Sequence, residues 1–129
     1  MNQRYLDWFK QAENDFEWAK DSRKCEHFAQ TCFICQQVAE KSIKSLAFKR
    51  GADLVKGHSI LNIAKALGIN GEIEMIGRKL DLFYISTRYP YAVPSGSPFE
   101  YFSAEQADEA LSLTEIFLKK MKELIEHDS

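Results

Sequence analysis

The chain has 129 residues, with 17 Lys and Arg against 19 Asp and Glu, and its net charge at pH 7 is −2. A hydrophobic fraction of 45% and a charged fraction of 28% are ordinary for a globular protein and exclude the disordered, collagen-like and membrane classes. The near-neutral net charge also excludes a protein that binds nucleic acid through its overall charge. It does not exclude a local basic patch that binds nucleic acid. We expect one domain over residues 1–129.

Apolar residues recur at the spacing of helices along most of the chain. In the first such stretch they follow a four–three–four–three step, which places them on one stripe of an amphipathic helix. The members of this stripe are Tyr5, Phe9, Ala12, Phe16 and Ala19. The predicted helices lie near residues 3–21, 25–50, 59–67, 73–87 and 103–125.

Glycine, proline and capping residues separate these helices. Gly68 follows the short third helix, where a left-handed residue is often needed, and Asn70 is placed to cap the fourth. Ser103 and Gln106 form a capping-box pattern at the start of the last helix. Before that helix, a proline-rich loop cannot be regular structure, because each proline removes a backbone donor; it holds Pro90, Pro94 and Pro98. Four long helices, one short helix and this loop predict an all-α bundle.

The compartment and the metal content are predicted from the cysteines and the apolar runs. Cys25, Cys32 and Cys35 are an odd, closely spaced set, which argues against a disulfide framework. Cys32 and Cys35 fall on the apolar stripe of the second helix, so buried thiols are favoured over zinc ligands. The polar start of the chain shows no signal peptide, and no apolar run is long enough for a membrane span. We expect a cytoplasmic protein without a metal or cofactor.

Two segments contain residues that the packing of a helical bundle alone does not explain. Residues 35–44 read CQQVAEKSIK within the predicted second helix, and residues 84–91 read YISTRYPY before the proline-rich loop. Together with HSIL at 58–61 and YFS at 101–103, their order and spacing resemble the HEPN family (higher eukaryote and prokaryote nucleotide-binding domain), in particular its prokaryotic subgroup with a TRYP motif. The resemblance covers nearly the whole chain. Tyr91 stands where this subgroup usually has Asp.

The resemblance implies an up-and-down helical bundle that commonly forms a two-fold dimer, with a groove near the subunit contact. Some members of the family are metal-independent ribonucleases, often toxins, in which an Arg is followed after four to six residues by a His. Others pair with a small nucleotidyltransferase or bind nucleotides. Arg88 matches the arginine of the ribonuclease motif, but positions 93–95 are Val, Pro and Ser, so the motif is incomplete here.

The candidate site residues have alternative interpretations. Metal-free RNA cleavage needs a base for the 2′-hydroxyl proton and a cation for the charged phosphorane. Arg88 supplies the cation by contact with phosphate oxygens, or else it bonds the last carbonyls of its own helix. His58 supplies the base if the fold brings it to Arg88, and otherwise it caps a helix or faces solvent. Tyr89 and Tyr91 either stack on a base or pack the loop onto the bundle.

Basic residues on the second helix and aromatic residues on the first are further candidates. Lys41 and Lys44 form, with Glu40, either a solvated face with local ion pairs or part of a groove shared with Arg88. Aromatic residues go right round the first helix, which predicts a subunit contact there; they are Trp8, Phe9, Phe16 and Trp18.

The leading hypothesis is a dimeric module that binds a nucleotide or a partner and works beside a minimal nucleotidyltransferase, as in a toxin–antitoxin pair. Its site uses Arg88 for phosphate, Tyr89 with Tyr91 for stacking, and Lys41 or Lys44 as supporting charge. The alternative is a metal-independent endoribonuclease in which Arg88 works with a displaced histidine such as His58. A third hypothesis is a scaffolding bundle without either activity, and the sequence leaves open whether the protein is an enzyme.

Overall fold

A computed structural model describes residues 4–127, which are helical with connecting turns and loops. The helices are α1 (Tyr5–Lys24), α2 (Phe28–Lys49), α3 (Ile60–Ala66), α4 (Glu72–Asp81), α5 (Phe83–Ser86) and α6 (Ala104–His127), and two 3-10 turns, Pro90–Ala92 and Pro98–Tyr101, lie between α5 and α6. The predicted all-α class is therefore confirmed. Residues 1–3, which include the expected start of the first helix, lie outside the described part of the chain.

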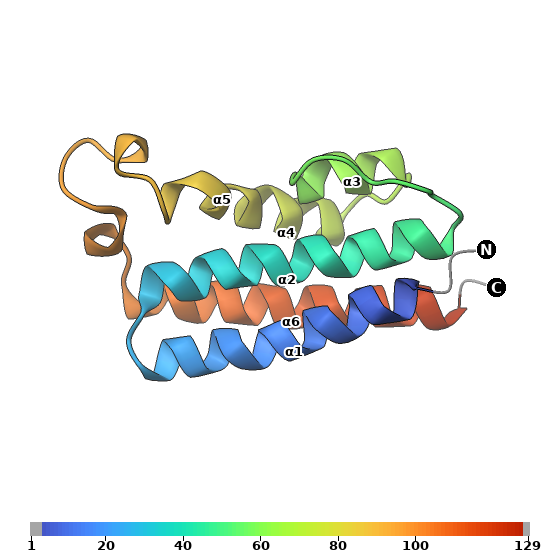
Figure 1. The fold of residues 1–129 in the computed structure, drawn as a ribbon, viewed down its shortest axis with the longest axis horizontal. Coiled ribbons are helices and arrows are strands. Elements are labelled where there is room, and N and C mark those ends of the chain that lie inside the picture. The colour runs from blue at the N-terminus through green and yellow to red at the C-terminus, as the bar shows by residue number, and fades with distance from the viewer. Residues whose placement is uncertain (1–3, 128–129) are drawn as a thin grey trace.

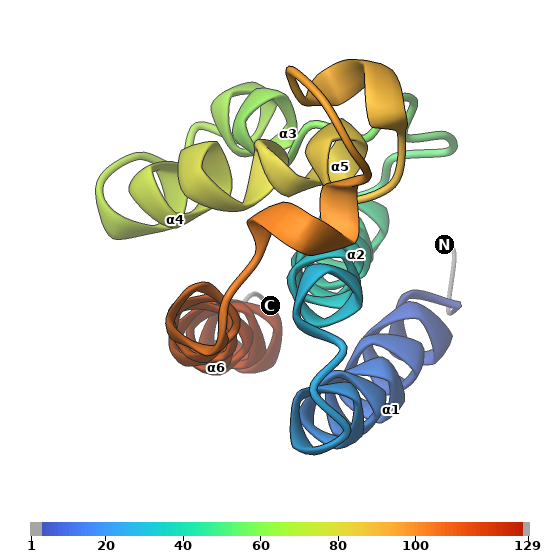
Figure 2. The same cartoon turned by 90° about the vertical axis from the view of Figure 1, so that its left-hand side faces the viewer.

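Helix α2 lies at the centre of the bundle. The long helices α1 and α6 run along it, and α3, α4 and α5 cover its remaining side (Figures 1 and 2). Small side chains let its neighbours approach closely, and Ala39, Ser42 and Ser45 are fully buried. Since α2 is enclosed from several sides, several of its polar residues are buried too, among them Gln36, Glu40 and Lys44. That burial creates the unusual environment described below.

The predicted stripe on α1 forms one wall of the core. Phe9, Ala12, Phe16 and Ala19 are buried there, as the helical spacing requires. Trp18 lies on the outside and is 58% exposed. The subunit contact expected for α1 stays a prediction. The exposed indole of Trp18 is the feature of α1 that supports it.

The fourth predicted helix is divided in two. Helix α4 ends at Asp81 and α5 begins at Phe83. Leu82 between them keeps right-handed helical angles, so the interruption is local and the chain continues in nearly the same direction (Figure 1). The prediction of Asn70 as the cap of α4 is wrong. The N-cap is Gly71, whose φ of 82° lies in the region that only glycine adopts readily.

The other punctuation residues act as the sequence predicts. Gly68 follows α3 with a φ of 73°. Ser103 and Gln106 exchange hydrogen bonds at the start of α6, from Ser103 N to Gln106 Oε1 at 2.8 Å and from Gln106 N to Ser103 Oγ at 3.4 Å. The proline-rich loop is irregular apart from its two 3-10 turns, and the hydroxyl of Tyr101 closes it by donating to the carbonyl of Ser95.

We expect only one of the three cysteines to react with a thiol reagent in the folded protein. Burial raises the pKa of Cys32 and of Cys35 to about 12, so neither thiol forms thiolate at pH 8, whereas Cys25 is exposed. Titration with a chromogenic disulfide at pH 8 should show one fast equivalent, and three after denaturation. Two or more fast equivalents in the native protein would contradict the buried placement.

Among residues 4–127, no group of three or more His, Cys, Asp and Glu is placed to hold a metal ion. Within the same residues, no helix combines the length and the apolar character that crossing a membrane requires.

Candidate functional site

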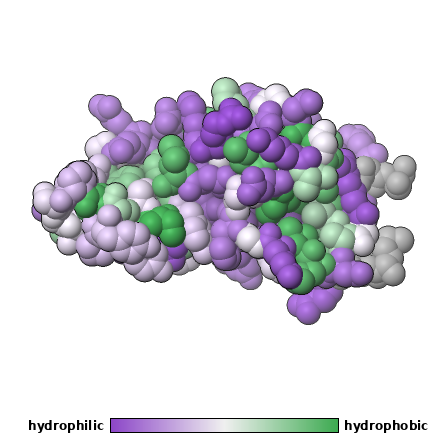
Figure 3. All heavy atoms as spheres, turned by 90° about the horizontal axis from the view of Figure 1, so that it is seen from above, coloured by the Kyte–Doolittle hydropathy of each residue, from purple (hydrophilic) through white to green (hydrophobic). Residues whose placement is uncertain are grey.

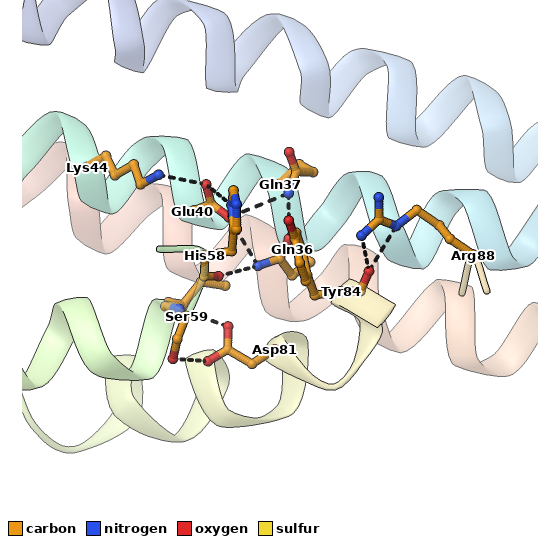
Figure 4. Close-up of polar contacts among 10 residues, drawn as sticks. Gln36, Gln37, Glu40, Lys44, His58, Ser59, Asp81, Tyr84 and Arg88 are labelled. Carbon is orange, nitrogen blue, oxygen red and sulfur yellow. Dashed lines mark hydrogen bonds and ion pairs between the residues drawn. The ribbon is translucent and has the colours of Figure 1, made fainter. Parts of the chain in front are cut away.

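A buried row of polar side chains on α2 forms the base of the site. Gln36 and Glu40 are 0% and 5% exposed, and they lie one turn apart with Lys44 one turn further on. The carboxylate of Glu40 accepts from Lys44 Nζ at 2.9 Å and lies 3.5 Å from the amide nitrogens of both Gln36 and Gln37 (Figure 4). Every polar group of this row therefore has a partner, as buried polar groups require.

His58 comes to this row from the loop before α3. Its Nδ1 lies 3.2 and 3.3 Å from the two oxygens of Glu40, and its side chain is 55% exposed. A carboxylate only accepts, so this hydrogen bond requires the proton on Nδ1. In the neutral imidazole Nε2 then carries the lone pair, and this nitrogen has no hydrogen-bond partner within the described chain. Glu40 thus fixes one tautomer and leaves Nε2 available to a ligand.

Two backbone anchors hold His58 in this position. The amide of Gln36 donates to the His58 carbonyl at 2.9 Å. Immediately after it, the carboxylate of Asp81 at the end of α4 accepts from Ser59 Oγ, Ile60 N and Leu61 N at 2.9, 2.8 and 3.1 Å. Asp81 therefore caps α3 from a neighbouring helix and fixes where the preceding imidazole lies (Figure 4).

The ring of Tyr84, on α5, lies between His58 and Arg88 (Figure 4). The imidazole stacks on it at 4.6 Å between ring centroids, with the two planes 17° apart. The guanidinium carbon of Arg88 lies 4.7 Å from its centroid. The fold therefore brings His58 close to Arg88, although an aromatic ring separates the two groups.

Arg88 is held in a cage of three aromatic rings. Its guanidinium carbon lies 4.3, 4.7 and 4.9 Å from the ring centroids of Phe33, Tyr84 and Tyr89. Its Nε and Nη2 donate to the Tyr84 carbonyl at 2.9 and 2.6 Å, which is the bond to its own helix that the sequence left as one alternative. A guanidinium has five N–H donors, so others stay available to an anion while the side chain is held rigidly.

The loop after Arg88 displays further aromatic side chains. Tyr89 and Tyr91 stack at 5.6 Å, with planes 19° apart, and are 40% and 77% exposed. Figure 3 shows hydrophobic residues on the face formed by α3, α4 and α5, both toward the end with the loop and toward the opposite end. Leu82, between α4 and α5, and Phe99, in the second 3-10 turn, are 73% and 66% exposed. Residues 82–99 contain no Asp or Glu, so an anionic ligand meets no like charge within this segment.

The structure gathers some predicted site residues and separates others. Arg88, Tyr89 and Tyr91 form one end of the site, and Lys44 joins it through Glu40. Lys41 lies elsewhere: its Nζ is 2.5 Å from Asp15 on α1. Glu40 and Lys44 are buried, so the solvated face considered for them is wrong.

Sequence reasoning gave no role to Tyr84 or Phe33, which provide the central ring of the site and one wall of the cage. Tyr84 stands four residues before Arg88, one helical turn away, and this spacing is the signal that points to a contact. Nothing in the sequence alone connects Phe33 on α2 to Arg88, because their contact depends on how α5 packs against α2.

Fold and site together define a helical-bundle domain with a polar site that α2, α5 and the loop before α3 form around Tyr84, with Arg88 at its edge. The HEPN domain model matches residues 5–124, which is most of the chain, so the chain belongs to the HEPN family. This finding confirms the family resemblance of the sequence, while membership of the TRYP-motif subgroup stays a prediction.

Two solved structures are similar over nearly their whole length. TT1696 from Thermus thermophilus superposes with a TM-score of 0.89 at 34% identity, covering 95% of this chain and 98% of that one. ST0689, described as an archaeal HEPN homologue, gives a TM-score of 0.83 at 33% identity and covers 96% and 99%. A protein of Methanocaldococcus jannaschii named "Putative toxin MJ1304" is 25% identical over 139 residues, covering 97% of this chain and 91% of that protein.

Proposed function

We propose that this HEPN protein binds a nucleotide or single-stranded RNA as one half of a toxin–antitoxin-like pair. The binding site is formed around Tyr84 by Arg88, His58 and the polar row of α2, and is called the Tyr84 site from here on. The observation that carries the proposal is the position of Arg88: an exposed guanidinium, held by three rings and one carbonyl, with donors left for a phosphate. Charge-assisted contacts of this kind are the strong ones in phosphate recognition. Tyr91, which stacks on Tyr89 and is 77% exposed, offers a ring face to a base beside that phosphate.

The wider arrangement belongs to the same proposal. The toxin name of one relative supports a two-protein system. We extend this to a minimal nucleotidyltransferase as the partner and to a homodimer as the active form. Lys44 contributes charge to the site through Glu40, whereas Lys41, being paired with Asp15, supports the α1–α2 contact.

A second candidate function is metal-independent RNA cleavage, and one observation favours it. The buried Glu40 orients His58 so that Nε2 is available as a base. Against it, the Tyr84 ring lies between His58 and Arg88, so one scissile phosphate does not meet both groups unless that ring moves. Binding is therefore the function that the geometry supports best.

The test is a titration of a fluorescently labelled single-stranded RNA by anisotropy, at a stated salt concentration. We expect Arg88→Ala to weaken binding by about tenfold or more, because it removes a charge-assisted contact worth roughly 1.5–3 kcal/mol. The matched control is Lys24→Ala, which removes an exposed cation from the last turn of α1, a helix that contributes no residue to the Tyr84 site, and should leave binding unchanged. Equal binding by the two variants would refute the proposed site.

The same RNA, incubated in EDTA with wild type, Arg88→Ala and His58→Ala, separates the two candidates. Intact RNA in all three samples supports a binding module. Cleavage by wild type that both substitutions abolish would replace binding by ribonuclease activity as the function of this site, and would show that Tyr84 moves during the reaction.

A further inference from the structure

A second concave site, separate from the Tyr84 site, lies between α1 and α2. Its cavity has a volume of about 480 Å³ and shares no lining residue with the Tyr84 site. Cavities of roughly 300–1,000 Å³ are the usual size of small-molecule sites. The location also accounts for Lys41, which lines this cavity and is not part of the Tyr84 site.

One wall of the cavity is aromatic. Trp8 and Phe48 face each other across α1 and α2, with ring centroids 5.3 Å apart and planes tilted by 42°. Trp8 is only partly buried, so part of its indole is open to a ligand in the cavity. An indole face attracts apolar groups and, through its quadrupole, cations.

The charges around the cavity leave one carboxylate unbalanced. Lys41 forms an ion pair with Asp15, with 2.5 Å between its Nζ and the Asp15 Oδ2. Arg4 pairs with Asp7, with 3.3 Å between its Nε and the Asp7 Oδ2. Asp53 also lines the cavity, is exposed, and makes no hydrogen bond or ion pair with any residue of the described chain. An anion in this cavity would have to compete with Asp15 and Asp7 for Lys41 and Arg4. A cation would instead meet the carboxylate of Asp53, and Trp8 lines the same cavity.

We propose that this cavity binds a guanidinium or amidinium cation carried on a short apolar body. Such a cation is planar and weakly hydrated, so it stacks on Trp8 while it donates to the Asp53 carboxylate, and a compact, strongly hydrated ammonium does this less well. The apolar body packs on Phe48. A free metabolite and the arginine side chain of a partner protein carry the same chemistry.

The test uses Trp8 as the reporter. Trp18→Phe leaves Trp8 as the only tryptophan, and Trp18 does not line the cavity. We titrate this protein with butylguanidinium and with its neutral isostere butylurea, and follow tryptophan emission. Butylguanidinium should saturate the signal with about tenfold higher affinity, given a cation–π contact and a charge-assisted hydrogen bond. Equal affinity of the two probes, or no saturable change, overturns the proposal.

Two substitutions locate the charge that matters. Asp53→Asn should reduce the preference for butylguanidinium at least threefold, whereas Asp21→Asn, an exposed carboxylate outside the cavity, should leave it unchanged. A preference that survives Asp53→Asn overturns the role of Asp53. A third probe, N-acetylargininamide, distinguishes the sources: tighter binding than butylguanidinium supports a partner's arginine side chain, and weaker binding supports a free metabolite. Neither result bears on RNA binding at Arg88.

Discussion

Replacing Glu40 with alanine should lower the free energy of unfolding by about 3–5 kcal/mol, because removing one partner of a buried ion pair leaves the other charge uncompensated. The side chains of Glu40 and Lys44 are 7% and 9% exposed, and their charged atoms are 2.9 Å apart. The same carboxylate also accepts from His58 and receives two glutamine amides. Urea denaturation followed by circular dichroism at 222 nm measures the change.

Two matched variants show whether the loss of stability comes from the buried charge of Glu40 or from any replacement of a glutamate in a helix. Glu115→Ala removes a carboxylate that is 58% exposed and paired one turn away with Lys119, and should cost less than about 0.5 kcal/mol. The double variant Glu40→Leu with Lys44→Met replaces the pair by apolar groups and should recover most of the stability, since such replacements are often neutral. If Glu40→Ala cost no more than Glu115→Ala, the buried network would have no energetic role.

Helix positions were predictable from the sequence because each depends on local periodicity. The stripe of Phe9, Ala12, Phe16 and Ala19 and the capping box at Ser103 involve residues a turn apart, so the pattern alone indicates them. The break after Asp81 was not predictable in this way. There the side chain of one helix caps another helix 20 to 22 residues earlier in the chain, a tertiary contact without a local signal.

The same distinction between local and tertiary contacts holds for the residues of the candidate site. The family resemblance indicated Arg88 and His58, and the spacing on α2 brought Glu40 and Lys44 together. Which way Lys41 points was not fixed by periodicity, because it lies at the boundary between two faces of α2 and its partner Asp15 belongs to α1. The cage around Arg88 likewise depends on Phe33, 55 positions earlier in the chain, which packing alone brings into contact.

The second large effect is expected from Asp81→Ala, which should destabilise the protein by about 2–3 kcal/mol, since three hydrogen bonds to a charged acceptor are lost together. Two of the donors are backbone N–H groups at the start of α3, Ile60 and Leu61. Their amides should exchange faster with deuterium, whereas α1 and α6 should keep their protection. Lys79→Ala, an exposed substitution on the same helix, should change neither the stability nor the exchange.

The effect of Asp81→Ala should also extend to His58, two positions before Ile60. Gly77 on α4 allows no side chain, because a Cβ there would lie 2.8 Å from Ile60 Cγ2, so α3 and α4 touch closely and the cap sets how they dock. Without the cap, the imidazole should leave its stack on Tyr84, and the ring-current shift of its proton resonances in the NMR spectrum should decrease. Asp81→Asn keeps one acceptor oxygen and should retain part of that shift. An unchanged His58 resonance in Asp81→Ala would mean that Gln36 and Glu40 on α2 position the imidazole without help from α4.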